Sequence, residues 1–191
     1  DDLDAVASLV DLATELGDAR RPQHRSPDPA PTPPCTAEEY YDRTRSILSP
    51  QFHERGVLVV GASGGSYLIE KLARLGPARM VIIDPDVVEA TNLTRTAFRV
   101  DQLGQRKASA MAELIHSANP FVEVEPHDVD ITTIEPEGVR RLLDGIDLII
   151  AGTDSFEAQA TLNRWSQRVG IPAVFIGIHR GAEGGIVRWS I

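Results

Sequence analysis

The chain has 191 residues, a formal net charge of -9 at pH 7 and a single cysteine. This acidic balance argues against nucleic-acid binding as the main task, and one cysteine excludes an internal disulfide and a multi-cysteine zinc site within this chain. No apolar run approaches the ~18 residues that span a bilayer, and no signal peptide is visible, so we expect a cytoplasmic protein. The length suits one domain with an appendage.

The first 35 residues are predicted to form the appendage. Apolar residues spaced by three and four over residues 1–21 predict one amphipathic helix, which we expect to pack on the main domain or on a partner subunit. Six prolines within residues 22–35 predict a stiff, extended linker. Cys35 has no evident base nearby and is interpreted as incidental. Residues 36–191 are predicted to form the main domain; because the sequence stops directly after a strand-like run, we expect truncation at its C-terminus.

The segment 57–84 predicts a βαβ unit. Thr36 and Glu39 first indicate a short capped helix ahead of it. The apolar run 57–60 suits a strand buried on both faces, a helical pattern then continues to Gly76, and a second apolar strand ends on Asp84.

The turn between the first strand and the helix reads GASGGS and predicts a nucleotide site. Residues without side chains let backbone N–H groups approach a phosphate, while Asp84 can accept hydrogen bonds from ribose hydroxyls. The alternative is that the glycines only allow close packing of helix on strand. The glycines of this turn are Gly61, Gly64 and Gly65.

Two polar loops follow Asp84, where a plain dinucleotide-binding fold would pass promptly into another helix. The first, over residues 84–95, reads DPDVVEATNLTR, and the second ends on Lys107. Strands and helices then alternate to the end of the chain, which predicts the α/β class with a doubly wound, Rossmann-like, mostly parallel sheet. The expected helices are 108–115, 139–143 and 158–169, and the expected strands are 122–124, 146–151, 173–178 and 185–189.

Ligands bind beyond the carboxyl ends of the strands in such sheets. We therefore expect the glycine turn, Asp84 and Asp154 at one edge, with Arg95 and Lys107 in loops on the same route. Two cations exceed the needs of hydride transfer but suit a triphosphate, and a carboxylate at Asp154 can hold Mg²⁺. The alternatives are that both cations are solvated surface residues and that Asp154 only caps the following helix.

The order VLVVG, glycine turn, VIIDPDVVEATNLTR, LGQRKA and LIIAGTDSF resembles the adenylating superfamily of ThiF, MoeB and the ubiquitin-activating enzymes, over roughly residues 40–189. The resemblance implies an ATP-dependent adenylyltransferase. Its substrate would be the C-terminal glycine carboxylate of a ubiquitin-like protein, a sulfur-carrier protein or a peptide. The products would be an acyl-adenylate and pyrophosphate.

The resemblance also implies roles for individual residues. Asp84 would bind the ATP ribose and Asp154 would coordinate Mg²⁺. Arg43, or as second candidate Arg45, would match an arginine that the family usually delivers from the second subunit, so a homodimer is expected. Asn92, Arg95 and Lys107 would contact the phosphates, and Asp86 would also belong to the nucleotide site.

Three alternatives stay open. An NAD-dependent oxidoreductase explains the glycine turn and Asp84 but leaves the loop 92–107 without a purpose. A relative that dehydrates a modified tRNA base would adenylate a small carboxylate. A catalytically inactive, dimerising scaffold would be favoured if Arg95, Lys107 or Asp154 were missing, and all three are present. The catalytic cysteine and zinc-binding CxxC pairs of the family normally lie beyond residue 191, so zinc is not supported within this chain.

Overall fold

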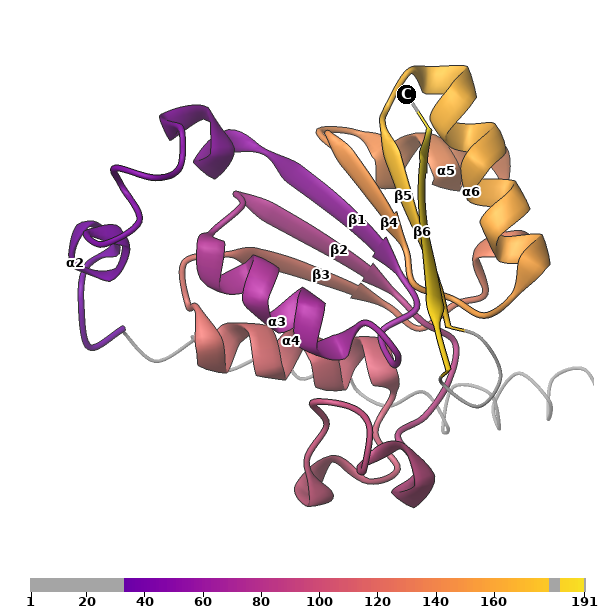
Figure 1. Ribbon diagram of the computed structural model, residues 1–191, viewed down its shortest axis with the longest axis horizontal. Coiled ribbons are helices and arrows are strands. Elements are labelled where there is room, and N and C mark those ends of the chain that lie inside the picture. The colour runs from indigo at the N-terminus through magenta and orange to yellow at the C-terminus, as the bar shows by residue number, and fades with distance from the viewer. Residues whose placement is uncertain (1–32, 179–182, 191) are drawn as a thin grey trace, which may run out of the picture. The chain divides into compact units, whose positions relative to one another are not determined.

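The computed structural model describes residues 33–178 and 183–190 (Figure 1). The helix expected over 1–21 and most of the linker over 22–35 lie outside the described residues. The strands of the described part form one six-stranded sheet in the order β3-β2-β1-β4-β5-β6. Neighbouring strands from β3 to β5 pair in parallel, and β6 pairs antiparallel with β5 at one edge. The prediction of a doubly wound, mostly parallel sheet is confirmed, in the strand order typical of dinucleotide-binding folds.

The bounds of the elements follow the hydrophobic pattern closely. The strands are β1 Gly56–Val60, β2 Arg79–Ile83, β3 Glu123–His127, β4 Leu148–Ala151, β5 Ala173–Ile178 and β6 Gly185–Ser190. The helices are α2 Ala37–Tyr41, α3 Ser66–Leu75, α4 Lys107–Ala118, α5 Pro136–Leu143 and α6 Phe156–Val169, with 3-10 turns at Pro50–Glu54, Ala90–Asn92, Val100–Gln102 and Ile131–Thr133. The strand expected over 122–124 extends to His127, because a proline such as Pro126 is tolerated on an edge strand.

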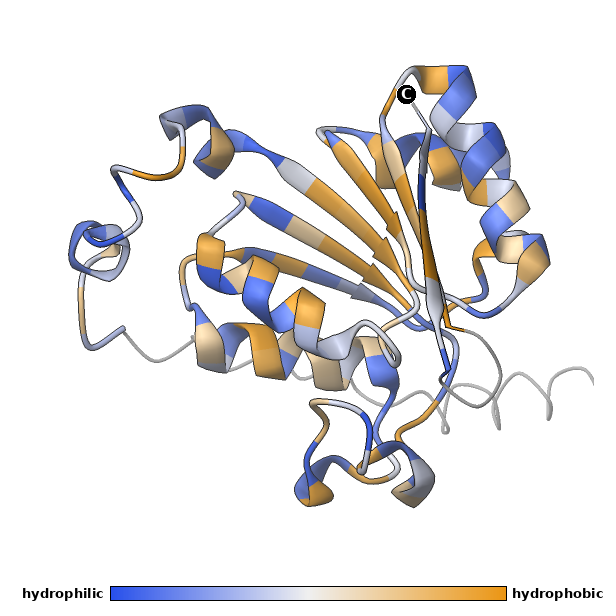
Figure 2. Ribbon diagram, in the orientation of Figure 1, coloured by the Kyte–Doolittle hydropathy of each residue, from blue (hydrophilic) through white to orange (hydrophobic). Residues whose placement is uncertain are grey.

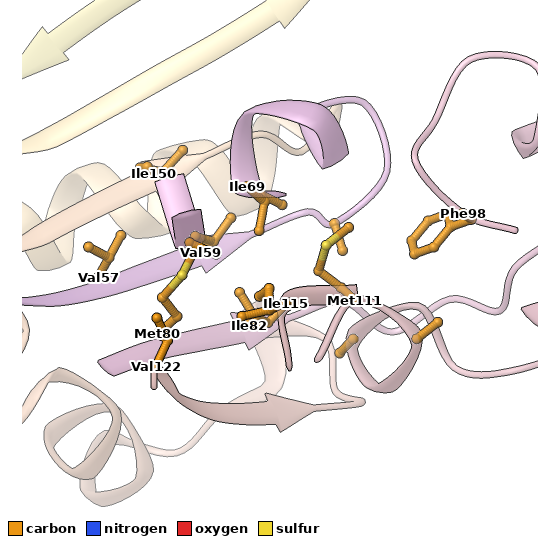
Figure 3. Close-up of a cluster of buried hydrophobic side chains, with 14 of the residues drawn as sticks. Val57, Val59, Ile69, Met80, Ile82, Phe98, Met111, Ile115, Val122 and Ile150 are labelled. Carbon is orange, nitrogen blue, oxygen red and sulfur yellow. The ribbon is translucent and has the colours of Figure 1, made fainter. Parts of the chain in front are cut away.

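Helices cover both faces of the sheet (Figure 1). Val57 and Val59 belong to the hydrophobic cluster that packs with α3 and α4, whereas Leu58 and Val60 belong to the cluster that packs with α5 and α6. Alternate side chains of β1 thus point to opposite layers, and the central strands are correspondingly hydrophobic in Figure 2. Figure 3 shows the first cluster, with side chains from β1, β2, α3 and α4. Burying each such side chain contributes about 1.5–3 kcal/mol.

The short helix α2 is fixed to the edge of the sheet at which the strands begin. The predicted capping box between Thr36 and Glu39 is present. The Tyr41 ring lies over Gly76, which ends α3 with φ 81°, and its hydroxyl accepts a hydrogen bond from Asn119 at the end of α4 (2.7 Å). Because the ends of α3 and α4 lead back to the starts of strands, α2 lies at the amino edge of the sheet.

Within residues 33–178 and 183–190, no helix is both long and apolar enough to cross a membrane.

Candidate functional site

The glycine turn follows β1 at the carboxyl edge of the sheet, and its glycines are required for different reasons. Gly61 has φ 91°, and a Cβ there would lie 2.7 Å from backbone atoms of Gly152 and Thr153, where the chain leaves β4. Gly61 is therefore required by backbone geometry and close packing. At Gly64 and Gly65 a Cβ would meet no described atom within 4 Å. Packing does not explain these two glycines, so the purely structural alternative holds for Gly61 alone.

The turn leads directly into the N-terminus of α3. Gly65 occupies the N-cap position, and no side chain caps the helix there. The first backbone N–H groups of a helix lack partners within it and carry the positive end of the helix dipole. The open space at Gly64 and Gly65 thus lies beside a helix end that favours an anion.

Asp84 connects this turn to the loop after β2. Its side chain is buried, with the residue 5% exposed. One carboxylate oxygen accepts from the backbone N–H of Ala62 (2.8 Å) and the other from that of Asp86 (3.0 Å). Burial raises the pKa of Asp84 above its usual value, while the two N–H donors and the positive charge of Lys107 act in the opposite direction. Each oxygen keeps a lone pair that can accept from a hydroxyl.

Lys107 begins α4 and is held against the same loop. Its ammonium lies 2.8 Å from the Asp86 carboxylate, and its side chain is only 9% exposed. Its backbone N–H donates to the Asp86 carbonyl (2.9 Å), and a bridge between Val87 and Arg106 joins the two segments. The alternative that Lys107 is a solvated surface cation is wrong.

Asn92 and Arg95 share the turn that follows this segment. Asn92 is 5% exposed, and its side-chain oxygen accepts from the backbone N–H of Glu89 (3.0 Å), which closes the turn. Arg95 is exposed, and its guanidinium makes no ion pair within the part of the chain that the structure describes. For Arg95 the alternative of a solvated cation stays open.

Sequence reasoning missed the residue that ties this turn to the glycine turn. Ser66, the first residue of α3, is fully buried, and its hydroxyl accepts from the backbone N–H of Ala97 (2.9 Å). The Asn92 carbonyl in turn accepts from the Thr96 hydroxyl (2.8 Å). A serine at a helix start was the only available signal. These contacts hold the loop after β2 beside the N-terminus of α3.

Asp154 follows β4 at the same edge and is exposed. The helix after it is capped by Ser155, whose hydroxyl accepts from the Ala158 N–H (3.3 Å). The alternative that Asp154 caps α6 is wrong, and its carboxylate remains available. No cluster of three potential metal-ligating side chains occurs among residues 33–178 and 183–190. A single carboxylate nevertheless fits Mg²⁺ when phosphate oxygens and waters supply the other ligands.

Arg43 does not join these residues within one chain. It is exposed and follows α2, at the amino edge of the sheet, whereas the glycine turn, Asp84 and Asp154 follow the carboxyl ends of strands. Arg45, the second candidate, pairs with Glu38 (3.3 Å) in the same segment. Within one chain, both arginines thus lie at the edge of the sheet opposite to the glycine turn.

Comparison with known proteins places these features in a family. Residues 50–188 match the ThiF family. The chain is 33% identical over 148 residues to ubiquitin-like modifier-activating enzyme 5 of Dictyostelium discoideum, covering 71% of this chain and 38% of that protein. It is 34% identical over 126 residues to the SAMP-activating enzyme E1 of Haloferax volcanii, covering 65% of this chain and 46% of that protein. The chain thus spans less than half the length of these two relatives.

Solved structures give a consistent result. The structure of tRNA N6-threonylcarbamoyladenosine dehydratase, TcdA, from E. coli matches with a TM-score of 0.65 and 28% identity, over 77% of this chain and 68% of that chain. The same E. coli protein in complex with ATP matches with a TM-score of 0.64 and 30% identity, over 72% and 58% of the two chains. Because the family match extends over most of the described sheet and its loops, the chain belongs to the ThiF family.

Proposed function

We propose that the chain binds ATP at the carboxyl edge of its sheet and activates a carboxylate as an acyl-adenylate. The observation that carries this proposal is an unbroken series of contacts from the glycine turn through Asp84 and Asp86 to the nearly buried ammonium of Lys107. A cation in that position suits displacement at a phosphate of a triphosphate, whereas hydride transfer to a nicotinamide develops no phosphate charge for it to neutralise. The ATP complex of the E. coli relative supports the choice of nucleotide.

The residues have the following proposed roles. Asp84 accepts hydrogen bonds from the ribose, and Gly64 and Gly65 leave room for phosphate at the start of α3. Lys107, Arg95 and the side-chain amide of Asn92 contact phosphate oxygens. Asp154 holds Mg²⁺, which supplies additional neutralisation of phosphate charge.

The reaction then needs no nucleophile from the protein. A carboxylate oxygen of the substrate attacks the α-phosphorus, the bond from that phosphorus to the bridging oxygen of the β-phosphate breaks, and pyrophosphate leaves with that oxygen. The acyl group and AMP remain joined as the acyl-adenylate. The side chains position the reactants and neutralise the charge that develops.

A homodimer in the cytoplasm is part of the proposal. Arg43 is exposed at the amino edge of its own sheet. It can therefore contact a triphosphate only if this segment of one subunit reaches the nucleotide site of the other. A closed two-fold dimer would give each site one Arg43 from the partner.

The proposed substrate is the C-terminal carboxylate of a ubiquitin-like or sulfur-carrier protein, or of a peptide. The names of the relatives from Dictyostelium discoideum and Haloferax volcanii support this class. Similarity to the E. coli tRNA N6-threonylcarbamoyladenosine dehydratase favours a second candidate, a small carboxylate on a modified tRNA base. The net charge of -9 favours the first, because tRNA is a polyanion.

The first test compares thermal stabilisation by Mg-ATP with that by NAD⁺ and NADH. A nucleotide that binds only the folded state adds about 2.7 kcal/mol at about 100 times its dissociation constant. We expect a shift with Mg-ATP alone, lost in Lys107→Ala and kept in Lys71→Ala, an exposed lysine of α3 that serves as control. A shift with NAD⁺ instead would replace adenylation by hydride transfer.

The second test measures ATP–pyrophosphate exchange with a panel of carrier proteins that end in glycine. Arg95→Ala and Asp154→Ala should each abolish exchange and leave the fold intact, because both side chains are exposed. Exchange at the wild-type rate in either variant would remove that residue from the site.

A further inference from the structure

The ammonium that the proposed function assigns to a phosphate already has an anionic partner in the chain. The Asp86 carboxylate lies 2.8 Å from the Lys107 ammonium. We propose that Asp86 takes the place of a phosphate group in the nucleotide-free protein, so that a ligand must displace its carboxylate before it contacts Lys107. This inference rests on the proposed function and makes Asp86 a residue that determines ligand specificity.

The two side chains differ in their freedom to move. The Lys107 side chain is 9% exposed and that of Asp86 is 65% exposed. Lys107 therefore stays where the surrounding chain holds it, whereas the Asp86 carboxylate can rotate into water.

Such a rotation needs no movement of the backbone. The Lys107 N–H donates to the Asp86 carbonyl (2.9 Å), the Val88 N–H to the Gln105 carbonyl (2.8 Å), and the Gly104 N–H to the Val88 carbonyl (2.9 Å). None of these bonds involves the Asp86 carboxylate. The exchange of carboxylate for phosphate is thus confined to one side chain.

Electrostatics explains why an internal partner is needed. A nearly buried ammonium without an anion beside it is destabilising, because water no longer solvates its charge. The other carboxylate nearby, that of Asp84, is already bound by the N–H groups of Ala62 and Asp86. Asp86 therefore supplies the counter-charge until a ligand does so.

The exchange selects ligands by charge. A phosphate oxygen replaces the carboxylate at the ammonium, and the freed carboxylate is solvated by water. A ligand without phosphate leaves the pair of Asp86 and Lys107 unbroken and gains nothing from this ammonium. The pair thus weakens the binding of every ligand that must break it, and it does not affect the binding of adenosine.

The test is a calorimetric titration of the full chain with Mg-ATP and with adenosine. Asp86→Asn keeps the shape of the side chain and removes its charge, and we expect Mg-ATP to bind about threefold to tenfold more tightly, the latter being about 1.4 kcal/mol. Adenosine should bind as it does to the wild type. Asp86→Glu keeps the charge and should leave Mg-ATP affinity within about twofold of wild type.

Asp101→Asn is the matched control. Asp101 pairs with Arg99 at 3.0 Å in the neighbouring loop, and its side chain is 68% exposed, close to the 65% of Asp86. This variant makes the same change in net charge without touching Lys107. We expect unchanged affinity for Mg-ATP, so a gain in Asp86→Asn alone isolates the local exchange from the overall charge.

Two results would overturn the inference while leaving the proposed function in place. Weaker or equal binding of Mg-ATP by Asp86→Asn, with binding still dependent on Lys107, would make Asp86 a nucleotide ligand or a bystander. An equal gain for adenosine would show a general effect on the loop. Failure of Mg-ATP to bind the wild type or to depend on Lys107 would instead contradict the proposed function itself.

Discussion

The contrast between Gly61 and Gly64 gives a quantitative test of which part of the turn serves the fold and which part serves the ligand. Gly61→Ala places a Cβ at φ 91° and within 2.7–2.8 Å of the backbone of Gly152 and Thr153. The left-handed conformation costs about 1–2 kcal/mol, and overlap with backbone adds roughly 1–3 kcal/mol. We expect Gly61→Ala to lower the free energy of unfolding by about 3 kcal/mol.

Gly64→Ala should impair ligand binding rather than stability. Its Cβ meets no described atom within 4 Å, so stability should stay within about 0.5 kcal/mol of wild type. If phosphate occupies that space, the added methyl group excludes it, and the stabilisation of about 2.7 kcal/mol that saturating Mg-ATP gives the wild type should be lost.

The assay is urea denaturation of the wild type and both variants, each with and without Mg-ATP. The ligand-free curves separate folding defects from binding defects. A Gly61→Ala protein within about 1 kcal/mol of wild type would refute the packing argument, because overlap with backbone cannot be relieved by a rotamer change. Full stabilisation of Gly64→Ala by Mg-ATP would refute the assignment of that space to phosphate.

Three further predictions concern the fold, the pH dependence and the assembly. Asn119→Ala should lower the free energy of unfolding by about 3 kcal/mol, because the buried Asn119 amide donates to the Tyr41 hydroxyl and to a carbonyl of α3. The affinity for ATP should be unchanged. Urea denaturation and an ATP titration check the two expectations. Because burial raises the pKa of Asp84, the folded state favours the protonated carboxyl. Stability should therefore fall as pH rises from the ordinary value of 3.8 through the higher pKa of the folded protein, and Asp84→Asn should remove this component; an unchanged pH profile would contradict it. Mixing inactive Arg43→Ala with inactive Lys107→Ala should restore roughly a quarter of the wild-type ATP–pyrophosphate exchange activity. Half of the dimers would be mixed, and each mixed dimer would have one intact site. No recovery of activity, in mixtures whose subunits are shown to re-associate, would argue against an arginine from the partner.

The hydrophobic pattern predicted most of the secondary structure because it depends on local rules. The continuous apolar run of β1 and the helical spacing along α3 follow from which faces are buried, and Gly76 ends α3 in the left-handed conformation that glycine favours. The edge position of β3 does not follow from the hydrophobic pattern. It depends on pairing with β2 alone, and it explains why the strand continues through Pro126.

The site was predicted in part. The expectation that glycines, carboxylates and cations follow the carboxyl ends of strands needs only the parallel topology, which the alternation of elements indicates. The partner of each side chain was not predictable in this way. Ser155 rather than Asp154 caps α6, and Asn92 closes its own turn through its side-chain oxygen. Both depend on local backbone angles that the residue types permit but do not impose.

The sequence alone therefore determined the class of the fold, the location of the glycine turn and the residue types available for chemistry, because periodicity and glycine content act over a few residues. Only the tertiary structure decided that Lys107 is nearly buried against Asp86, since contacts between residues 21 apart depend on how two loops pair. It also decided that Arg43 lies at the opposite edge of the sheet from the glycine turn. The physical reason is that burial and charge pairing are properties of the assembled chain, in which distant segments share one low-dielectric environment.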